Sequence, residues 1–248
     1  MGFIMKQHET VIKVMEGNGG FATLGYLYQN VLKDSNCKWK TKTPFASIRR
    51  IVQDERFFFK IKPGLWALKT HKDEVLKQLS IDDKSSTKQK EEFDHTYYQG
   101  LLVEIGNIKG FTTFVPNQDK NKMFLNKPLK ELTHLEEIHP FTYPELVQKA
   151  RTIDVIWFNE RKFPFSLFEV EHTTSIYNSL LKFIEFQDFN SNFYIASIKN
   201  RKEEFDQKIN ATAFKDIRTK IKFIDYENIS KLHIKSYELR DIQKETGL

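Results

Sequence analysis

The chain has 248 residues, of which 40% are hydrophobic and 14% are aromatic, so it can bury a sizeable core and can hold two modest domains. Its single cysteine, Cys37, excludes an internal disulfide and a cysteine-rich zinc site. No apolar run approaches the roughly 18 to 20 residues of a membrane span, and the N-terminus lacks the apolar segment of a secretory signal. We therefore expect a soluble cytoplasmic protein.

The net charge of +6 is concentrated near the N-terminus. Residues 1–80 carry 14 Lys and Arg against 7 Asp and Glu, whereas the remaining residues have a net charge of −1. Local positive charge of this kind attracts polyanions through counterion release. Lysine-rich surfaces are also common in proteins that bind no nucleic acid, so charge alone leaves both interpretations open.

The first 80 residues predict three helices and a hairpin. Helical signals cover Glu9–Met15, Leu24–Leu32 after a Thr23 cap, and Phe45–Asp54 after Thr43-Pro44; the hairpin strands are Phe57–Lys62 and Leu65–Leu68, around Pro63-Gly64. This order of elements is the plan of a winged helix, whose third helix enters the major groove of DNA.

Two stretches of this region, Thr43–Val52 and Phe58–Leu68, resemble the winged module called HARE-HTH. The resemblance covers roughly residues 8 to 70 and implies contact with double-stranded DNA. Candidate DNA-binding residues are Lys40, Lys42, Ser47, Arg49, Arg50, Lys60 and Lys62. The two arginines have the strongest claim because guanidinium groups suit guanine edges and phosphates. A winged helix that binds only protein is the alternative interpretation.

Residues 81–94 are polar and charged and cannot bury much apolar area, which predicts a linker between a domain at 1–80 and a second domain at 95–248. The second domain has predicted helices at 95–107, 143–150, 175–189 and 201–214, and predicted strands at 111–115, 153–158, 167–174, 192–198 and 221–225. This order indicates a mixed α/β fold in which helices flank one sheet.

Acidic residues interrupt two of these apolar strands. Glu169 and Glu171 lie two positions apart and must share one face of their strand, and Asp154 lies near the start of the preceding strand. Buried carboxylates are costly unless they are paired or bind a metal. Carboxylates together with a backbone carbonyl, such as that of Val170, suit Mg²⁺. An exposed edge strand whose glutamates face solvent is the alternative.

An acid, a gap of 14 residues and then acid-x-acid on the next strand resembles the PD-(D/E)XK nuclease core, over about residues 95 to 200. The resemblance implies Asp154 and Glu169 as metal ligands and a restriction-endonuclease-like fold. The family usually has lysine where this chain has Glu171, which is then a base or a second-metal ligand. Lys182 on the following helix is a candidate for the missing positive charge, and Glu104 on the upstream helix is a possible further acid.

Together these observations predict an Mg²⁺-dependent type II restriction endonuclease that cuts double-stranded DNA at a specific sequence. Cleavage of both strands of a symmetric site predicts a homodimer, and a DNA methyltransferase is the expected genetic partner. Two alternatives stay open: a non-catalytic DNA-binding regulator with a nuclease-like dimerisation core, and a structure-specific repair or recombination nuclease.

Overall fold

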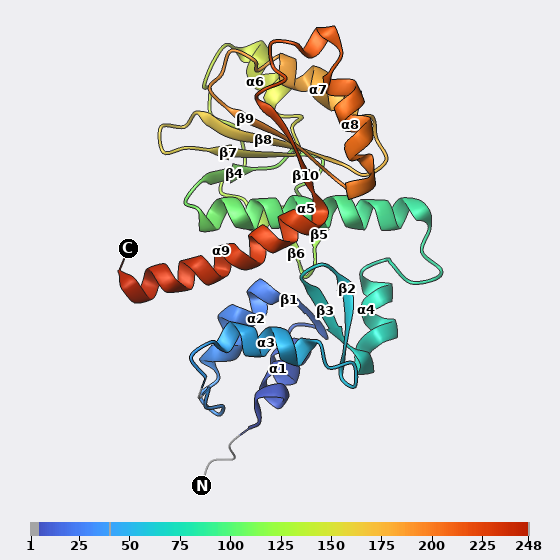
Figure 1. The fold of residues 1–248 in the computed structure, drawn as a ribbon, viewed down its shortest axis with the longest axis vertical. Helices are drawn as coiled ribbons and strands as arrows, with labels where there is room; N and C mark the ends of the chain where they lie inside the picture. The colour runs from blue at the N-terminus through green and yellow to red at the C-terminus, as the bar shows by residue number, and fades with distance from the viewer. Residues whose placement is uncertain (1–4, 40, 248) are drawn as a thin grey trace. The chain divides into compact units, whose positions relative to one another are not determined.

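The computed structural model describes residues 5–39 and 41–247, which form two compact units (Figure 1). One unit combines the chain up to Gln89 with the C-terminal segment from Ser230, and the other spans Lys90–Ile229. Within the described ranges, no helix combines the length and the apolar character needed to cross a membrane.

The first unit packs short helices against a small antiparallel sheet. Its elements are α1 (Gln7–Glu16), β1 (Phe21–Thr23), α2 (Leu24–Asn30), α3 (Pro44–Val52), β2 (Phe58–Lys62), β3 (Leu65–Leu68) and α4 (Lys72–Gln78), with 3₁₀ turns at Val31–Lys33 and Lys69–His71. The strand order is β1-β3-β2. The three predicted helices and the hairpin are therefore present. The sequence analysis missed β1, which is too short to show an alternating pattern.

Local sequence explains where these elements begin and turn. The Thr23 hydroxyl accepts a hydrogen bond from the Tyr26 amide at 3.1 Å, which caps α2 as predicted. Pro44 occupies the first turn of α3. Gly64 has a φ of +81° between β2 and β3, a conformation that glycine adopts without strain.

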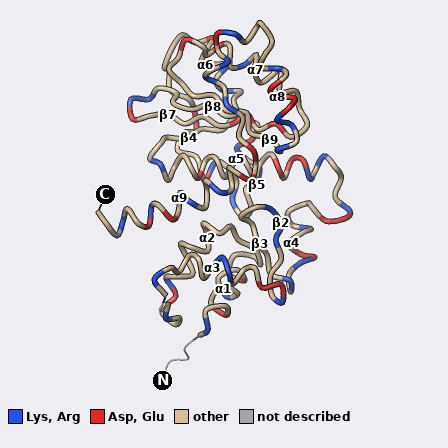
Figure 2. The backbone as a smooth tube through the Cα atoms, in the orientation of Figure 1, with Lys and Arg blue, Asp and Glu red and all other residues tan. Residues whose placement is uncertain are grey.

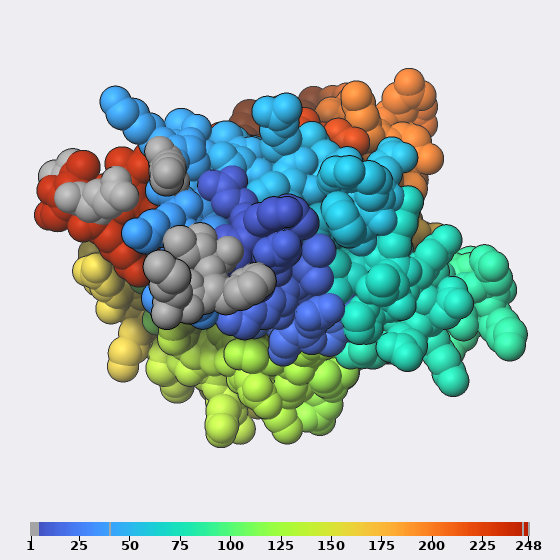
Figure 3. Space-filling model, turned by 90° about the horizontal axis from the view of Figure 1, so that it is seen from below, coloured from blue at the N-terminus to red at the C-terminus, as the bar shows by residue number. Residues whose placement is uncertain are grey.

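The C-terminal helix α9 (Tyr226–Thr246) was not predicted. Asp225 caps it, since its Oδ1 accepts a hydrogen bond from the Asn228 amide at 2.8 Å. The part of α9 that belongs to the first unit lies against the N-terminal helices (Figure 3). A Cβ added at Gly25 would lie 2.4 Å from Cε2 of Tyr237, so this close approach of α2 and α9 requires a glycine.

The second unit is built on a five-stranded mixed sheet. Its elements are α5 (Thr87–Ile108), β4 (Thr112–Phe114), α6 (Pro144–Ala150), β7 (Val155–Phe158), β8 (Pro164–Glu171), α7 (Ile176–Ile184), β9 (Asn192–Ser197), α8 (Lys202–Ile209) and β10 (Ile221–Asp225). A two-stranded hairpin, β5 (Met123–Phe124) and β6 (Lys127–Pro128), and 3₁₀ turns at Leu129–Glu131, Lys199–Arg201 and Thr212–Phe214 complete it. The strand order is β10-β9-β8-β7-β4, in which β8, β9 and β10 are parallel and β7 is antiparallel to both neighbours.

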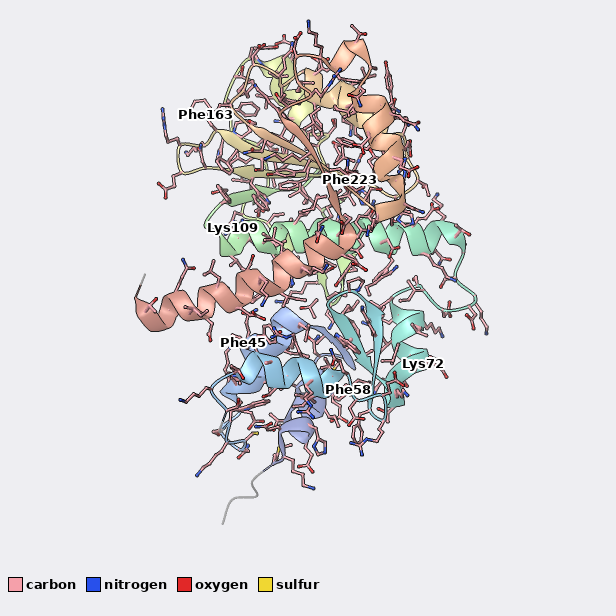
Figure 4. All side chains as sticks on the ribbon, in the orientation of Figure 1. Phe45, Phe58, Lys72, Lys109, Phe163 and Phe223 are labelled. Carbon is pink, nitrogen blue, oxygen red and sulfur yellow. The ribbon has the colours of Figure 1, made fainter. Side chains whose placement is uncertain are left out.

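Helices cover both faces of this sheet, as predicted (Figure 1). Side chains of β7, β8 and β9 such as Phe158, Leu167 and Ile195 form one core with residues of α6, α7 and α8. On the other face, the Trp157 indole N–H donates to the Leu102 carbonyl of α5 at 3.0 Å. Lys109 Nζ lies 5.9 Å from the centroid of the same Trp157 ring (Figure 4). The alternating side chains of the strands thus face two helical layers.

Several boundaries differ from the prediction. Helix α5 begins at Thr87, inside the predicted linker, because Ser86 and Gln89 cap its start with reciprocal hydrogen bonds. The predicted helix 201–214 is shorter, since α8 ends at Ile209. Strand β7 begins at Val155, so Asp154 precedes the strand instead of lying inside it. The compact units also differ in extent from the predicted domains, because residues from Ser230 onward pack with the N-terminal unit.

Candidate active site

Asp154, Glu169 and Glu171 lie at one end of the β7–β8 pair. The two strands are antiparallel, and Val155 at the start of β7 is paired with Phe168 near the end of β8. Asp154 therefore lies beside the last residues of β8 that carry the glutamates. All three carboxylates are buried. This burial removes the alternative of an edge strand whose glutamates face solvent.

Asp154 is held through one of its two carboxylate oxygens. Oδ2 accepts a hydrogen bond from the Val170 amide at 2.7 Å and lies 3.2 Å from Nε2 of His95 on α5. Because the N–H and C=O groups of one strand residue face the same neighbouring strand, the Val170 carbonyl also points to the β7 side, next to Asp154. The predicted carbonyl ligand thus lies beside the predicted carboxylate ligand.

Glu169 is the most deeply buried of the three acids, with 2% of its surface exposed. Its Oε2 lies 2.7 Å from Lys182 Nζ and 3.3 Å from the Ser179 hydroxyl, and both of these residues belong to α7. Its Oε1 is buried and has no hydrogen-bond partner among the described residues. Burial raises the pKa of Glu169 well above its usual range, the negative charge of Asp154 raises it further, and Lys182 opposes both effects.

Both carboxylate oxygens of Glu171 are hydrogen-bonded, one to the Ser179 hydroxyl and the other to the Thr174 hydroxyl. Burial raises the pKa of Glu171, and the bond from Ser179 partly offsets this effect. The Glu171 backbone is also held, because its carbonyl accepts hydrogen bonds from the Ser197 hydroxyl and from the Arg201 guanidinium. Glu171 therefore has a well-defined orientation.

Arg201 fastens the turn that follows Glu171. Its guanidinium donates to the carbonyls of His172 and Thr174 at 3.1 and 2.7 Å and to Glu204 at 2.9 Å. The sequence analysis did not single out this arginine, since only the crossover from β8 through α7 to β9 brings it to the turn. Arg201 thus stabilises the segment that connects β8 to α7.

Lys182 brings a positive charge to the carboxylate cluster. Besides Glu169, its ammonium group donates to the Thr152 carbonyl at 3.2 Å. Burial lowers the pKa of Lys182, but the negative charges of Glu169, Asp154 and Glu171 outweigh burial and the pKa is raised. Lys182 is therefore a protonated ammonium group between solvent and the buried acids, with 38% of its side chain exposed.

On α5, His95 and not Glu104 is the side chain that reaches Asp154. The two residues are nine positions apart, roughly two and a half helical turns, so they leave opposite faces of the helix. Burial lowers the pKa of His95, but the hydrogen bond and the charge of Asp154 outweigh it and the pKa is raised. The sequence analysis missed His95 because a lone histidine on a helix carries no motif.

Asp154 and Glu169 offer carboxylate oxygens, the ligand type that hard cations prefer. In the described part of the chain, no three His, Cys, Asp or Glu side chains are grouped so that they could hold a metal ion by themselves. Mg²⁺ is usually bound through one or two carboxylates and keeps several waters. The buried Oε1 of Glu169, which has no described partner, and the neighbouring Asp154 carboxylate supply ligands of this kind.

The predicted DNA-binding residues belong to the first unit. Lys40 lies outside the described residues. Lys42, Arg50 and Lys60 are exposed, and Ser47 and Lys62 are partly exposed. Figure 2 shows basic positions on α3 and on the β2–β3 hairpin.

The Arg49 side chain makes its contacts within the first unit. Its guanidinium forms an ion pair with Glu238 of α9 and donates to the Tyr28 hydroxyl at 3.1 Å. Burial raises the pKa of Tyr28 to about 12, against the opposing charge of Arg49. Arg49 therefore joins α3 to α2 and α9, whereas its neighbour Arg50 points to solvent.

The family model described as the C-terminal domain of the type II restriction enzyme NmeDI matches residues 76–246, which is more than half of the chain. The chain belongs to the NmeDI C-terminal domain family. The matched residues of this NmeDI-family chain include every acid described above. The type II restriction enzyme NmeDI of Neisseria meningitidis serogroup C is 24% identical over 149 residues, which cover 56% of this chain and 42% of that relative. The chain thus aligns with less than half of the relative's length. No solved structure matches this NmeDI-family chain.

Proposed function

We propose that this chain is an Mg²⁺-dependent endonuclease of the type II restriction class, which hydrolyses phosphodiester bonds of double-stranded DNA at a specific sequence. The observation that carries the proposal is the acidic cluster at the end of β7 and β8, where the buried Glu169 pairs with Lys182 and feels the negative charge of the buried Asp154. Membership in a family named for a type II restriction enzyme supports the same reaction.

The arrangement of the second unit supports a restriction-endonuclease-like, PD-(D/E)XK-type core. An acid precedes β7, acid-x-acid closes its antiparallel neighbour β8, and helices flank the sheet. The position usually held by lysine is Glu171. We propose that Lys182 takes over the role of that lysine from α7, because its ammonium group contacts Glu169, the proposed metal ligand.

Each residue of the site then has a defined role. Asp154, Glu169 and the Val170 carbonyl would hold the Mg²⁺ ion. When bound, such an ion supplies positive charge that activates water and stabilises the oxygen leaving phosphorus. Lys182 stabilises the negative charge that develops on the phosphate group. Glu171, whose pKa is raised by burial, is the candidate general base.

The first unit supports the proposal of a winged-helix DNA-binding module. Helix α3 turns Ile48 and Val52 into the core and leaves Arg50 exposed beside the small side chains of Ala46 and Ser47. The major groove of B-DNA admits an α-helix, and arginine can pair there with guanine edges. We propose that Ser47 and Arg50 contact DNA, and that Lys42, Lys60 and Lys62 contact its phosphates. Arg49 instead attaches α3 to α9 through its ion pair with Glu238.

Cleavage of both strands at a symmetric site requires two copies of the site, so we propose a homodimer whose genetic partner is a DNA methyltransferase. The decisive experiment is incubation of the protein with plasmid DNA and Mg²⁺. Discrete fragments support the restriction class, junction-dependent cutting supports a repair nuclease, and no cleavage with any divalent cation supports a non-catalytic regulator.

Variants Asp154→Ala and Glu169→Ala test the site within that experiment. Both should lose cleavage, by about a thousandfold, because charge stabilisation by a bound metal contributes several kcal/mol. Both should keep their affinity for duplex DNA, measured by fluorescence anisotropy, because that affinity is assigned to the first unit. Cleavage at the wild-type rate by either variant contradicts the assignment.

A further inference from the structure

Helix α5 presents two polar side chains to Asp154. His95 and Gln99 are four positions apart and therefore lie one turn apart on the same helix face. His95 Nε2 lies 3.2 Å from the Asp154 carboxylate, and Gln99 Nε2 donates to the Asp154 backbone carbonyl at 2.8 Å. Helix α5 thus contacts Asp154 at two points, the side-chain carboxylate and the backbone carbonyl.

Gln99 is itself held in place. It is completely buried, and its amide nitrogen also donates to Oδ2 of Asp119 at 2.9 Å. Asp119 has 1% of its surface exposed, and its other oxygen lies 2.8 Å from Lys122 Nζ. The chain of contacts therefore runs from Lys122 through Asp119 and Gln99 to the peptide group of Asp154, so the Gln99 amide cannot rotate without breaking two hydrogen bonds.

This polar contact is costly for folding. His95 Nδ1 and Gln99 Oε1 are both buried without a hydrogen-bond partner among the residues that the structure describes. A buried polar atom without a partner destabilises the fold, and an apolar pair could pack a helix on a strand without that penalty. A separate hydrogen bond, from the Trp157 indole to the Leu102 carbonyl, also attaches α5 to the sheet.

We propose that His95 and Gln99 are positioning residues for Asp154. Gln99 fixes the backbone at residue 154, while His95 and the Val170 amide occupy Oδ2 of the carboxylate. A carboxylate only accepts hydrogen bonds, so Nε2 of His95 donates to Oδ2. Oδ1 is then directed to the reaction centre in one orientation. The inference rests on the proposed function, because it assigns the role of these residues in that same site.

The test compares His95→Leu and Gln99→Met, which remove the donors, with His95→Gln, whose amide nitrogen can replace Nε2 as a donor. Lys88→Gln, at an exposed position of α5, is the matched control. Two quantities are measured for each protein: Mn²⁺ affinity by electron paramagnetic resonance, and kcat and KM for plasmid cleavage with Mg²⁺. Thermal melting shows whether each variant is folded.

Loss of a residue that orients a metal ligand typically costs about 10- to 100-fold in metal affinity or activity. We expect losses of that size in Mn²⁺ affinity and kcat for His95→Leu and Gln99→Met, with KM for DNA unchanged. His95→Gln should stay within a few-fold of wild type, and Lys88→Gln should equal it. A folded His95→Leu protein with wild-type Mn²⁺ affinity and kcat overturns the inference, and so does a folded His95→Gln protein as impaired as His95→Leu.

The two measurements separate this inference from the proposed function. A wild-type protein that binds Mn²⁺ but cuts no DNA removes the nuclease proposal, and weaker Mn²⁺ binding by His95→Leu then still supports the positioning role. A wild-type protein that cuts DNA, with variants that cut and bind Mn²⁺ equally well, removes only the positioning role. A wild-type protein that binds no Mn²⁺ overturns the positioning role in either case.

Discussion

The ion pair of Lys182 with Glu169 leads to the most direct physical prediction. Lys182→Met removes an ammonium group 2.7 Å from a carboxylate that is 2% exposed, and it keeps most of the apolar stem. Removal of one partner from a fully buried ion pair typically costs about 3–5 kcal/mol. Two features reduce that figure here: 38% of the Lys182 side chain is exposed, and Glu169 can take up a proton instead of remaining charged.

We therefore expect Lys182→Met to lower the free energy of unfolding by about 1–2 kcal/mol at neutral pH. In a domain of this size the melting temperature should fall by roughly 3–8 °C. The matched control is Lys149→Met, which breaks an exposed ion pair of 2.6 Å with Glu185. Exposed pairs contribute at most about 1 kcal/mol, so the control should change stability little.

The destabilisation caused by Lys182→Met should change with pH in a defined direction. The pKa of Glu169 is already raised in the folded protein, so protonated Glu169 contributes stability at low pH that is lost as pH rises through the folded pKa. Lys182→Met raises this pKa further, and its destabilising effect should therefore be small in acid and grow toward pH 8. Thermal unfolding in EDTA, followed by circular dichroism from pH 5 to 8, measures it. Equal melting temperatures for Lys182→Met and Lys149→Met across that range would refute the reasoning.

Two further predictions concern DNA and metal binding. Arg50→Ala should weaken duplex binding and reduce the slope of log affinity against log salt by about 1. Arg49→Ala should instead lower the melting temperature, because it removes the ion pair with Glu238. Equal DNA-binding defects in the two variants would contradict these separate roles. Mg²⁺ should raise the melting temperature more at pH 8 than at pH 6, because a carboxylate ligand must be deprotonated and burial raises the pKa of Glu169, which favours its protonated form as the pH falls. A shift that is constant or smaller at pH 8, measured by differential scanning fluorimetry, would count against Glu169 as a ligand.

The family comparison and the geometry address different parts of the problem. The matched family model assigns the chain to the NmeDI C-terminal domain family. The contacts of the carboxylates show which side chains surround the glutamate at position 171. The Ser179 hydroxyl of α7 lies within hydrogen-bond distance of both Glu169 and Glu171, and Lys182 on the same helix contacts Glu169. The positive charge of the proposed site thus comes from α7 and the negative charges from the β7–β8 end of the sheet.

Local features of the sequence predicted much of the fold. Side chains alternate along a strand, so Glu169 and Glu171 had to share a face, and both contact α7. A threonine before an apolar helix and a glycine in a tight turn determine local geometry, and the cap at Thr23 and the turn at Gly64 are present. The Ser86–Gln89 cap of α5 was equally local but was overlooked within a charged stretch.

Contacts between distant residues could not be predicted in this way. His95 is 59 positions from Asp154, and Arg49 is 189 positions from Glu238. Nothing in the residues flanking Arg49 distinguishes a guanidinium that pairs inside the unit from one that faces solvent, as Arg50 does. The sequence by itself determined which acids share a face and where most helices and strands lie, because those properties depend on neighbours along the chain. Only the tertiary structure decided which side chains meet the acids, because packing of the helices on the sheet selects those partners.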